Sequence, residues 1–220
     1  MSDAALARKL RARWSADMGR SGPADDALAG VIARHAEPNR RYHTARHVAH
    51  VLRDVQRLAA AVGLDAASAR TVRLAAWFHD AVYDGRPGQD EEASAVLAER
   101  VLSRLGVPVG RTTAVCRLVR MTAAHSPDPG DPDAAVLSDA DLAVLAAAPA
   151  RYRRYRLAVR AEYGHLTDQQ FRTGREVVLR RIAGRRLIFS TATGVDRWER
   201  AARANLAAEL TLLAGTDKPC

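Results

Sequence analysis

Residues 73–80, RLAAWFHD, form an apolar run that ends abruptly in a histidine and an aspartate. The run closes a segment of helical apolar spacing, from about 66 to 79, and its apolar residues predict deep burial. An aspartate directly after such a run is costly to bury unless it is paired or bound to a metal ion. The alternative is that Asp80 only ends the helix, ahead of the turn residues Asp84 and Gly85. The doublet His79-Asp80 therefore marks a candidate site.

Helical spacing recurs along the rest of the chain, and no alternating strand pattern competes with it. In the segment 42–62, apolar residues recur at intervals of three and four: Val48, Val51, Leu52, Val55 and Leu58. Further helices are expected at about 91–105, 109–124, 134–147, 149–163, 168–184 and 195–214. The short stretch RRLIFST at 185–191 is the one candidate for extended chain. The pattern predicts an all-α fold, a single helical domain over residues 1–220.

The composition is that of a globular protein of ordinary size. The chain has 220 residues, of which 48% are hydrophobic and 27% charged, enough to bury a core. No apolar run approaches the roughly 18 residues of a membrane span, and the N-terminus lacks the apolar core of a signal peptide. Cys116 and Cys220 are the only cysteines, so no disulfide framework is implied. We expect a reduced, cytoplasmic setting and no membrane partner.

The net charge of +9 raises the question of a nucleic-acid partner. Lysine occurs only at positions 9 and 218, so 32 of the 34 basic residues are arginines, and these are spread along the chain. Such a skew is typical of a genome-wide coding bias, which adds surface charge without a partner. Aromatic residues for base stacking are few, at 5%. Nucleic acid is therefore disfavoured, and a small anionic ligand is favoured.

Three histidines precede the doublet in RYHTARHVAHVL, residues 41–52. His43, His47 and His50 are spaced i, i+4 and i+7, which places them on one face of a helix that begins near residue 42. This histidine face borders the apolar face of the same helix. Metal ligands on a buried helix would be arranged in this way. The alternative is a helix with three surface histidines.

Two aspartates interrupt the apolar segment VLSDADLAVL, residues 136–145. Helix capping by Ser138 or Asp139 accounts for the first of them. Asp141 is harder to explain in that way, because leucines and valines surround it. Two imidazoles and two carboxylates can together hold a divalent ion. We therefore expect Asp141 to be a metal ligand, with Asp139 as the second choice.

The ordered set of a histidine, a His-Asp doublet and a distal aspartate resembles the motif of the HD superfamily of metal-dependent phosphohydrolases. The longer pattern YHxxxH…WFHDxVYD…DEEASA…DADL…YRxYxxxVRxEY is similar to a compact bacterial subgroup of predicted HD phosphohydrolases. The resemblance runs from about residue 38 to residue 210. It implies an HD-type helical bundle with its core motif region at about 38–165, on which the helices of 168–214 pack.

The resemblance implies a divalent ion held by His47, His79, Asp80 and Asp141, with His43 and Asp139 as second choices. Mixed nitrogen and oxygen ligands suit Mn, Fe, Co, Ni or Zn better than Mg. The ion would activate a water for attack on phosphorus, and Asp80 could orient that water. The implied reaction is hydrolysis of a phosphate ester or anhydride in a small phosphorylated metabolite, with a nucleotide as the leading candidate.

Further catalytic candidates lie near the motif. His125, in MTAAHS, is a candidate to contact phosphate, to protonate the leaving group or to bind a second ion. Asp84 and Glu91, in YDGRPGQDEEASA at 83–95, are candidates for the general base or for ligands of a second ion. Glu91 and Glu92 are explained equally well as first-turn acids that complement a helix dipole.

The arginine-rich segment RYRRYRLAVRAEY, residues 151–163, is the candidate for substrate binding. Arg156 and Arg160 flank a face of tyrosines, so either could bind a phosphate in a bidentate manner. Tyr155 and His43 are further candidates to contact the substrate. The alternative is a surface helix whose tyrosines pack inward. Apolar faces near the C-terminus would allow a homodimer.

Two other functions stay open from the sequence. The chain could be a non-catalytic module that senses a nucleotide or binds a partner, with a structural or degenerate metal site. It could also bind nucleic acid through its arginines, although no recognised motif supports this. A structural metal contributes folding free energy outright, which separates the first alternative from an enzyme.

Overall fold

The computed structural model describes residues 2–215, and within them it contains ten α-helices, one 3-10 helix and no strand. The predicted all-α fold is confirmed. The α-helices are α1 (Asp3–Met18), α2 (Gly22–Arg34), α3 (Ala45–Val62), α4 (Ala66–Phe78), α5 (Gln89–Arg104), α6 (Val109–Met121), α7 (Pro132–Leu142), α8 (Pro149–Glu162), α9 (Asp168–Ala183) and α10 (Ala192–Gly215). The 3-10 helix η1 (Ala143–Ala146) continues α7.

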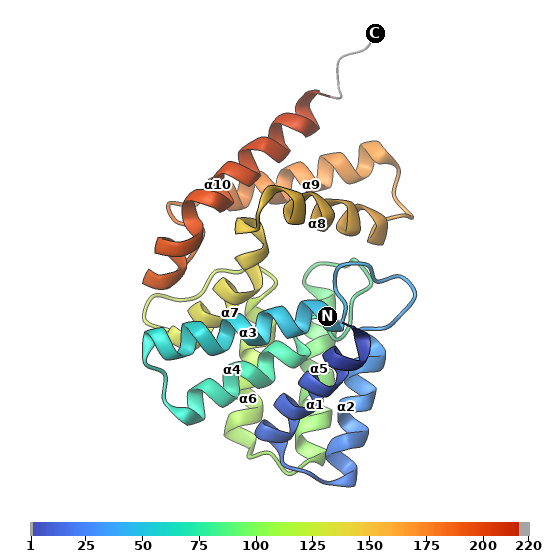
Figure 1. Cartoon of the computed structure of the whole chain (residues 1–220), viewed down its shortest axis with the longest axis vertical. Coiled ribbons are helices and arrows are strands. Elements are labelled where there is room, and N and C mark those ends of the chain that lie inside the picture. The colour runs from blue at the N-terminus through green and yellow to red at the C-terminus, as the bar shows by residue number, and fades with distance from the viewer. Residues whose placement is uncertain (1, 216–220) are drawn as a thin grey trace.

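Helices α1 to α7 form a bundle around one large apolar core (Figure 1). Trp14 of α1 and Trp77 of α4 meet edge to face in this core, with ring centroids 5.4 Å apart. Phe78 lies beside them, and all three rings are 0% exposed, which confirms the burial predicted for 73–80. Helix α4 packs against α3, α5, α6 and α7. These contacts fix the end of α4, and with it the position of His79, the next residue.

Helices α8, α9 and α10 form a second unit that follows η1 (Figure 1). Their smaller core includes Tyr152, Leu179 and Leu206. Trp198 of α10 packs against both cores and joins the two units. The boundary between the cores therefore falls at the junction of α7 and η1. Helix α8 belongs with α9 and α10, and not with the core motif region expected at about 38–165.

Helix α3 begins later than the segment 42–62 expected from the sequence. It starts at Ala45 and ends at Val62, and the next residue, Gly63, closes the helix in the left-handed conformation with a φ of 79°. His43 therefore lies in the turn before α3, off the helix that carries His47 and His50. The expected common face of three histidines is wrong for His43.

Residues 185–191 are irregular, without the extended structure considered for them. The main-chain N–H groups of Ser190 and Thr191 donate to the buried carboxylate of Asp139, at 2.8 and 2.7 Å. Helix α10 then passes so close that a Cβ at position 194 would collide with this carboxylate, which explains the glycine there. The segment thus anchors the start of α10 to α7.

No helix within residues 2–215 is both long enough and apolar enough to cross a membrane. Cys116 is a buried free thiol on α6, and Cys220 lies outside the described residues. Burial raises the pKa of the Cys116 thiol, and its Sγ donates to the carbonyl oxygen of Ala95. Cys116 therefore behaves as a small core residue.

Candidate metal centre

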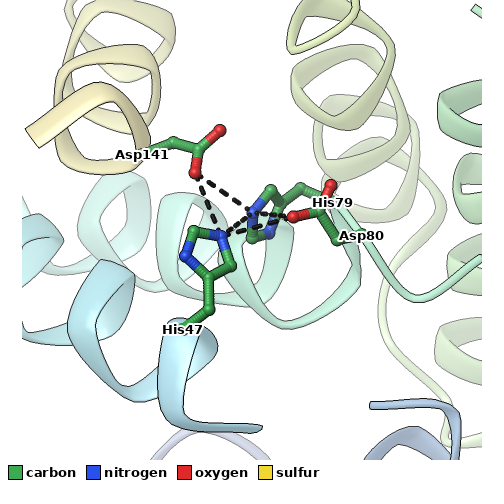
Figure 2. A group of neighbouring side chains, drawn as sticks. All are labelled: His47, His79, Asp80 and Asp141. Atoms are coloured by element: carbon green, nitrogen blue, oxygen red, sulfur yellow. Dashed lines mark hydrogen bonds and ion pairs between the residues drawn. The ribbon is translucent and has the colours of Figure 1, made fainter. Parts of the chain in front are cut away.

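Four side chains that are distant in the sequence meet at one point (Figure 2). His47 comes from α3, the doublet His79-Asp80 follows the last turn of α4, and Asp141 lies in the last turn of α7. Their ligand atoms all lie within 4.8 Å of one another. The structure thus brings together the ligand set expected from the sequence, and this group could bind a metal ion.

The spacing of the ligand atoms suits such an ion. Nε2 of His47 lies 3.0 Å from Nε2 of His79 and 3.1 Å from Oδ1 of Asp141. Nε2 of His79 lies 3.0 Å from Oδ2 of Asp80. Ligand atoms about 2.1 Å from an ion, at tetrahedral or octahedral angles, are roughly 3.0 to 3.4 Å apart. Two imidazole nitrogens and two carboxylate oxygens directed at one centre therefore fit a divalent transition metal.

Two sets of hydrogen bonds hold the doublet in place. Nδ1 of His79 lies 3.1 Å from the carbonyl oxygen of Ala76, which can only accept, so Nε2 presents its lone pair to the cluster. Arg40, whose side chain is fully buried, donates to the carbonyl oxygens of Asp80 at 2.6 Å and Ala81 at 3.1 Å. The chain is therefore held on both sides of the two ligands.

Charges within the cluster shift the pKa values of its acidic and basic members in opposite directions. Burial alone would raise the pKa of Asp80, but His79, His43 and hydrogen bonds hold it well below its usual range. Burial alone would lower the pKa of His79, but Asp80 and Asp141 hold it well above its usual range. The carboxylates thus stay ionised and stabilise positive charge at the centre, whether that charge is a proton or a metal ion.

The structure separates the two aspartates that the sequence left as alternatives. Asp141 belongs to the ligand group. Asp139 is fully buried and accepts hydrogen bonds from residues 190 and 191, including one of 2.7 Å from the hydroxyl of Thr191. Its carboxylate is therefore engaged in anchoring α10, and it does not join the ligand group as the second choice would require.

His43, the other second-choice ligand, lies next to the cluster but outside the ligand group. Its Nδ1 is 2.7 Å from Oε2 of Glu162, and its ring packs on Tyr83 with centroids 4.0 Å apart. Oε1 of Glu162 accepts the main-chain N–H groups of Arg41, Tyr42 and His43, at 2.7, 2.7 and 2.9 Å. Glu162 of α8 therefore shapes the turn before α3 and orients the His43 ring.

His125 contacts the cluster directly, since its Nε2 lies 3.2 Å from Oδ2 of Asp141. Its φ of 47° is unusual for a residue other than glycine, and strain of this kind costs about 1–3 kcal/mol. Arg185 holds the segment by donating to the carbonyl oxygens of His125 at 2.7 Å and Ala124 at 2.6 Å. This backbone conformation, held by Arg185, directs the imidazole toward Asp141.

A cavity of 340 Å³, here named the aromatic cavity, opens at the cluster. Asp80 and Asp141 line it, together with His43 and His125. Aromatic and basic side chains form much of the remaining wall: Tyr83, Tyr155, Tyr163, Phe171, Arg175 and Arg181. Most of these wall residues belong to α8, α9 and the turn between them, so the second unit closes the cavity over ligands held by the first. Tyr155 and His43 thus lie where substrate contacts were expected.

Arg175 lines the aromatic cavity, whereas Arg156 and Arg160, the two arginines expected to bind phosphate, do not. Its side chain is nearly buried and donates to Oε1 of Glu209 at 2.9 Å. Arg160 instead pairs with Asp168 at 2.7 Å, and Nε of Arg156 lies 3.6 Å from Glu209. Neither lines the aromatic cavity, because α8 presents Tyr155 to that cavity and these two arginines to other neighbours.

The two acidic candidates of the segment 83–95 have different surroundings. Glu91 lines the aromatic cavity, but it also accepts the N–H of Gly88 at the start of α5, which is the capping role considered as its alternative. Asp84 is exposed and does not line that cavity, so the structure gives it no place at the reacting centre. Glu92 pairs with Arg120 at 2.6 Å on the surface.

Three residues that organise the site had no role in the sequence analysis: Arg40, Glu162 and Arg175. Glu162 carries a signal, because it is the only acidic residue in the basic segment 151–163. Arg40 and Arg175 carry none, since 32 arginines are spread along the chain and only packing shows which of them are buried.

No protein-family model matches the chain, and no curated protein matches it. Among solved structures, a crystal structure of a structural-genomics target from Lactobacillus plantarum is similar. The two are 19% identical, and the match covers 87% of this chain and 93% of the other, with a TM-score of 0.49. A similarity of this size carries no argument about family or function.

Proposed function

We propose that the chain is a metal-dependent phosphohydrolase of the HD superfamily, which cleaves a phosphate ester or anhydride in a small phosphorylated metabolite. One observation carries the proposal: two histidines and two aspartates, in the order of that motif, converge within 4.8 Å beside a cavity. Structural metal sites are closed by their ligands, whereas catalytic sites keep an open position. Here Asp80 and Asp141 both line the aromatic cavity, which favours an open site.

A bound divalent ion supplies Lewis acidity, which lowers the pKa of a water and polarises a phosphoryl oxygen. His47, His79, Asp80 and Asp141 would hold it. Oδ2 of Asp80 is the oxygen that lies near the two histidines, at 3.3 and 3.0 Å. Its Oδ1 is left to accept a hydrogen bond from the attacking water, and so to orient that water toward phosphorus.

We assign the protonation of the leaving group to His43, which lines the aromatic cavity. Its Nδ1 lies 2.7 Å from Oε2 of Glu162, and this contact fixes the orientation of the ring beside the aromatic cavity. We assign proton transfer to the leaving oxygen to the other ring nitrogen, Nε2. His125 has its Nε2 engaged by Asp141, so its assigned role is to hold this ligand in position.

A nucleotide is the proposed substrate class. The tyrosines and Phe171 of the aromatic cavity offer flat surfaces for a base, and Arg175 offers a planar guanidinium for a phosphate. A volume of 340 Å³ lies within the range of small-molecule sites. The mixed ligands favour Mn, Fe, Co, Ni or Zn over Mg.

The test is a phosphate-release screen over nucleotides and sugar phosphates, with Mn, Co, Ni and Mg each added to the purified protein. We expect release from at least one nucleotide with a transition metal, and loss of release when the metal is chelated. Circular dichroism should show that the chelated protein stays folded, because its core does not depend on the ion. Bound metal without any release, or unfolding on chelation, would favour a structural site in a binding module instead.

A further inference from the structure

A second cavity, of 250 Å³, also adjoins the metal centre. Asp141 lines both cavities, His47 lines this one and Asp80 lines the aromatic cavity, so the ligand group lies between the two. The second cavity is named here the arginine cleft, after the residues that line it from α3, α8 and α10: Arg53, Arg57, Arg151 and Arg197.

The arginine cleft carries uncompensated positive charge. Asp54 pairs with Arg53 at 2.5 Å and with Arg57 at 3.4 Å, and so offsets one of the four charges. Apart from the ligand Asp141, no other carboxylate lines the cleft. Within residues 2–215, neither Arg151 nor Arg197 takes part in an ion pair. Two guanidinium groups are therefore available to an anion beside the metal centre.

His50 orients Arg151 in the cleft. Nη2 of Arg151 lies 3.3 Å from Nδ1 of His50. Burial, with the nearby charges of Arg151 and Arg53, lowers the pKa of His50 to about 4. The imidazole is therefore neutral near pH 7, and its Nδ1 accepts a hydrogen bond from the guanidinium. A neutral acceptor holds Arg151 without cancelling its charge, and the remaining N–H groups can bind a ligand.

We propose that the arginine cleft binds a second phosphate group of the substrate, which is therefore a nucleotide with at least two phosphates. This rests on the proposed function: the base lies in the aromatic cavity, one phosphate lies at the metal centre and another reaches the arginine cleft. Arginine suits this role because its planar guanidinium binds two phosphate oxygens at once. A substrate with a single phosphate would not use Arg151 and Arg197.

The experiment compares the wild-type protein with Arg151→Ala, Arg197→Ala and a control, Arg100→Ala, which removes an exposed arginine of α5. Binding of inorganic pyrophosphate and of inorganic phosphate is measured by calorimetry on protein of known metal content. We expect pyrophosphate to bind about tenfold or more weakly to each cleft variant, in line with the loss of a charged hydrogen bond. The control should bind as the wild type does. Melting temperatures check that each variant is folded.

A second readout uses hydrolysis. For the cleft variants, kcat/KM should fall about tenfold or more on a nucleoside triphosphate and stay unchanged on a monophosphate. Unchanged pyrophosphate binding in both cleft variants would overturn the proposal, and so would equal losses on the triphosphate and monophosphate. Arginine-dependent pyrophosphate binding without hydrolysis of any nucleotide would support the anion site and contradict the phosphohydrolase activity.

Discussion

The two units of the molecule differ in how they are held together. The α1–α7 bundle is built around tryptophan and phenylalanine, and it supplies all four ligands of the metal centre. The α8–α10 unit has a smaller core, in which Glu209 is 3% exposed and accepts hydrogen bonds from Tyr152 at 2.5 Å and Arg175 at 2.9 Å. Apolar packing holds the candidate metal centre, whereas a buried polar network holds the wall of the aromatic cavity.

The two units therefore have different roles: the first holds the candidate metal ligands, and the second forms the wall of the aromatic cavity. A ligand group must keep its atoms within a few tenths of an ångström, and a close-packed core provides that rigidity. A buried network contributes little net stability but defines the orientation of Arg175 and Tyr155, which line the aromatic cavity. Glu162 crosses from the second unit to the turn before α3, and Asp139 crosses from the first unit to the start of α10. These two carboxylates set the position of the units relative to each other.

The largest expected effect comes from removing one ligand of the metal centre. Asp80→Asn keeps the shape of the side chain but loses its charge, so the metal affinity and the rate of phosphate release should each fall by more than about a hundredfold. Loss of residues that only support a ligand already costs 10–100-fold, approximately. Elemental analysis and a phosphate assay measure the two effects. Asp196→Asn, an exposed change on α10, is the control. Retention of metal and rate by the Asp80 variant would contradict the assigned centre.

The next effect compares the two cores. Phe78 and Leu206 are both 0% exposed, one in each core. Phe78→Ala should lower the free energy of unfolding by about 3–5 kcal/mol and also weaken metal binding, because it loosens the end of α4. Leu206→Ala should cost about 2–5 kcal/mol and leave metal affinity unchanged. Denaturant unfolding and metal titration measure both. Equal losses of metal affinity in the two variants would show that both units support the metal centre.

A smaller effect is expected at the contact between the units. Glu162→Gln removes the charge that accepts three N–H groups, and its amide turns an N–H toward Nδ1 of His43. Stability should fall by about 1.5–3 kcal/mol, and phosphate release should fall while the metal content stays the same. The control is Glu176→Gln, which removes the acid of a surface pair with Arg180. If the variant also lost bound metal, Glu162 would support the metal ligands and not His43.

Near neutral pH the smallest effect is expected at His35 of the first unit, where it appears as a change in the pH dependence of stability. Burial, with Arg40 nearby, lowers the pKa of His35 from 6.5 to about 3. As the pH falls through this window, the unfolded chain takes up the proton and the folded chain does not, so stability is lost by up to about 1.4 kcal/mol per pH unit. His35→Gln should therefore show a flatter decline in unfolding free energy below pH 6.5. Identical slopes for variant and wild type would exclude a neutral buried His35.

The sequence alone predicted the helical class and the four candidate ligands. Helical spacing shows in the chain because burial on one face repeats every three to four residues. His79-Asp80 and Asp141 can be detected because they interrupt apolar runs, where a polar side chain is costly to bury. His47 was selected among three histidines by the resemblance to the HD motif. Glu162 is detectable in the sequence as the one acidic residue of a basic segment. The sequence does not show that it contacts residues 41–43.

Only the tertiary structure separated Asp141 from Asp139, placed His43 off the helix and showed that Arg175 lines the aromatic cavity. Each of these outcomes depends on which neighbour a side chain meets after the chain has folded back on itself. Asp139 meets the N–H groups of residues 190 and 191, far away in the sequence. Among so many arginines, composition does not show which guanidinium faces a cavity and which pairs with a carboxylate. Local spacing predicts the face of a helix, and packing between helices decides what that face contacts.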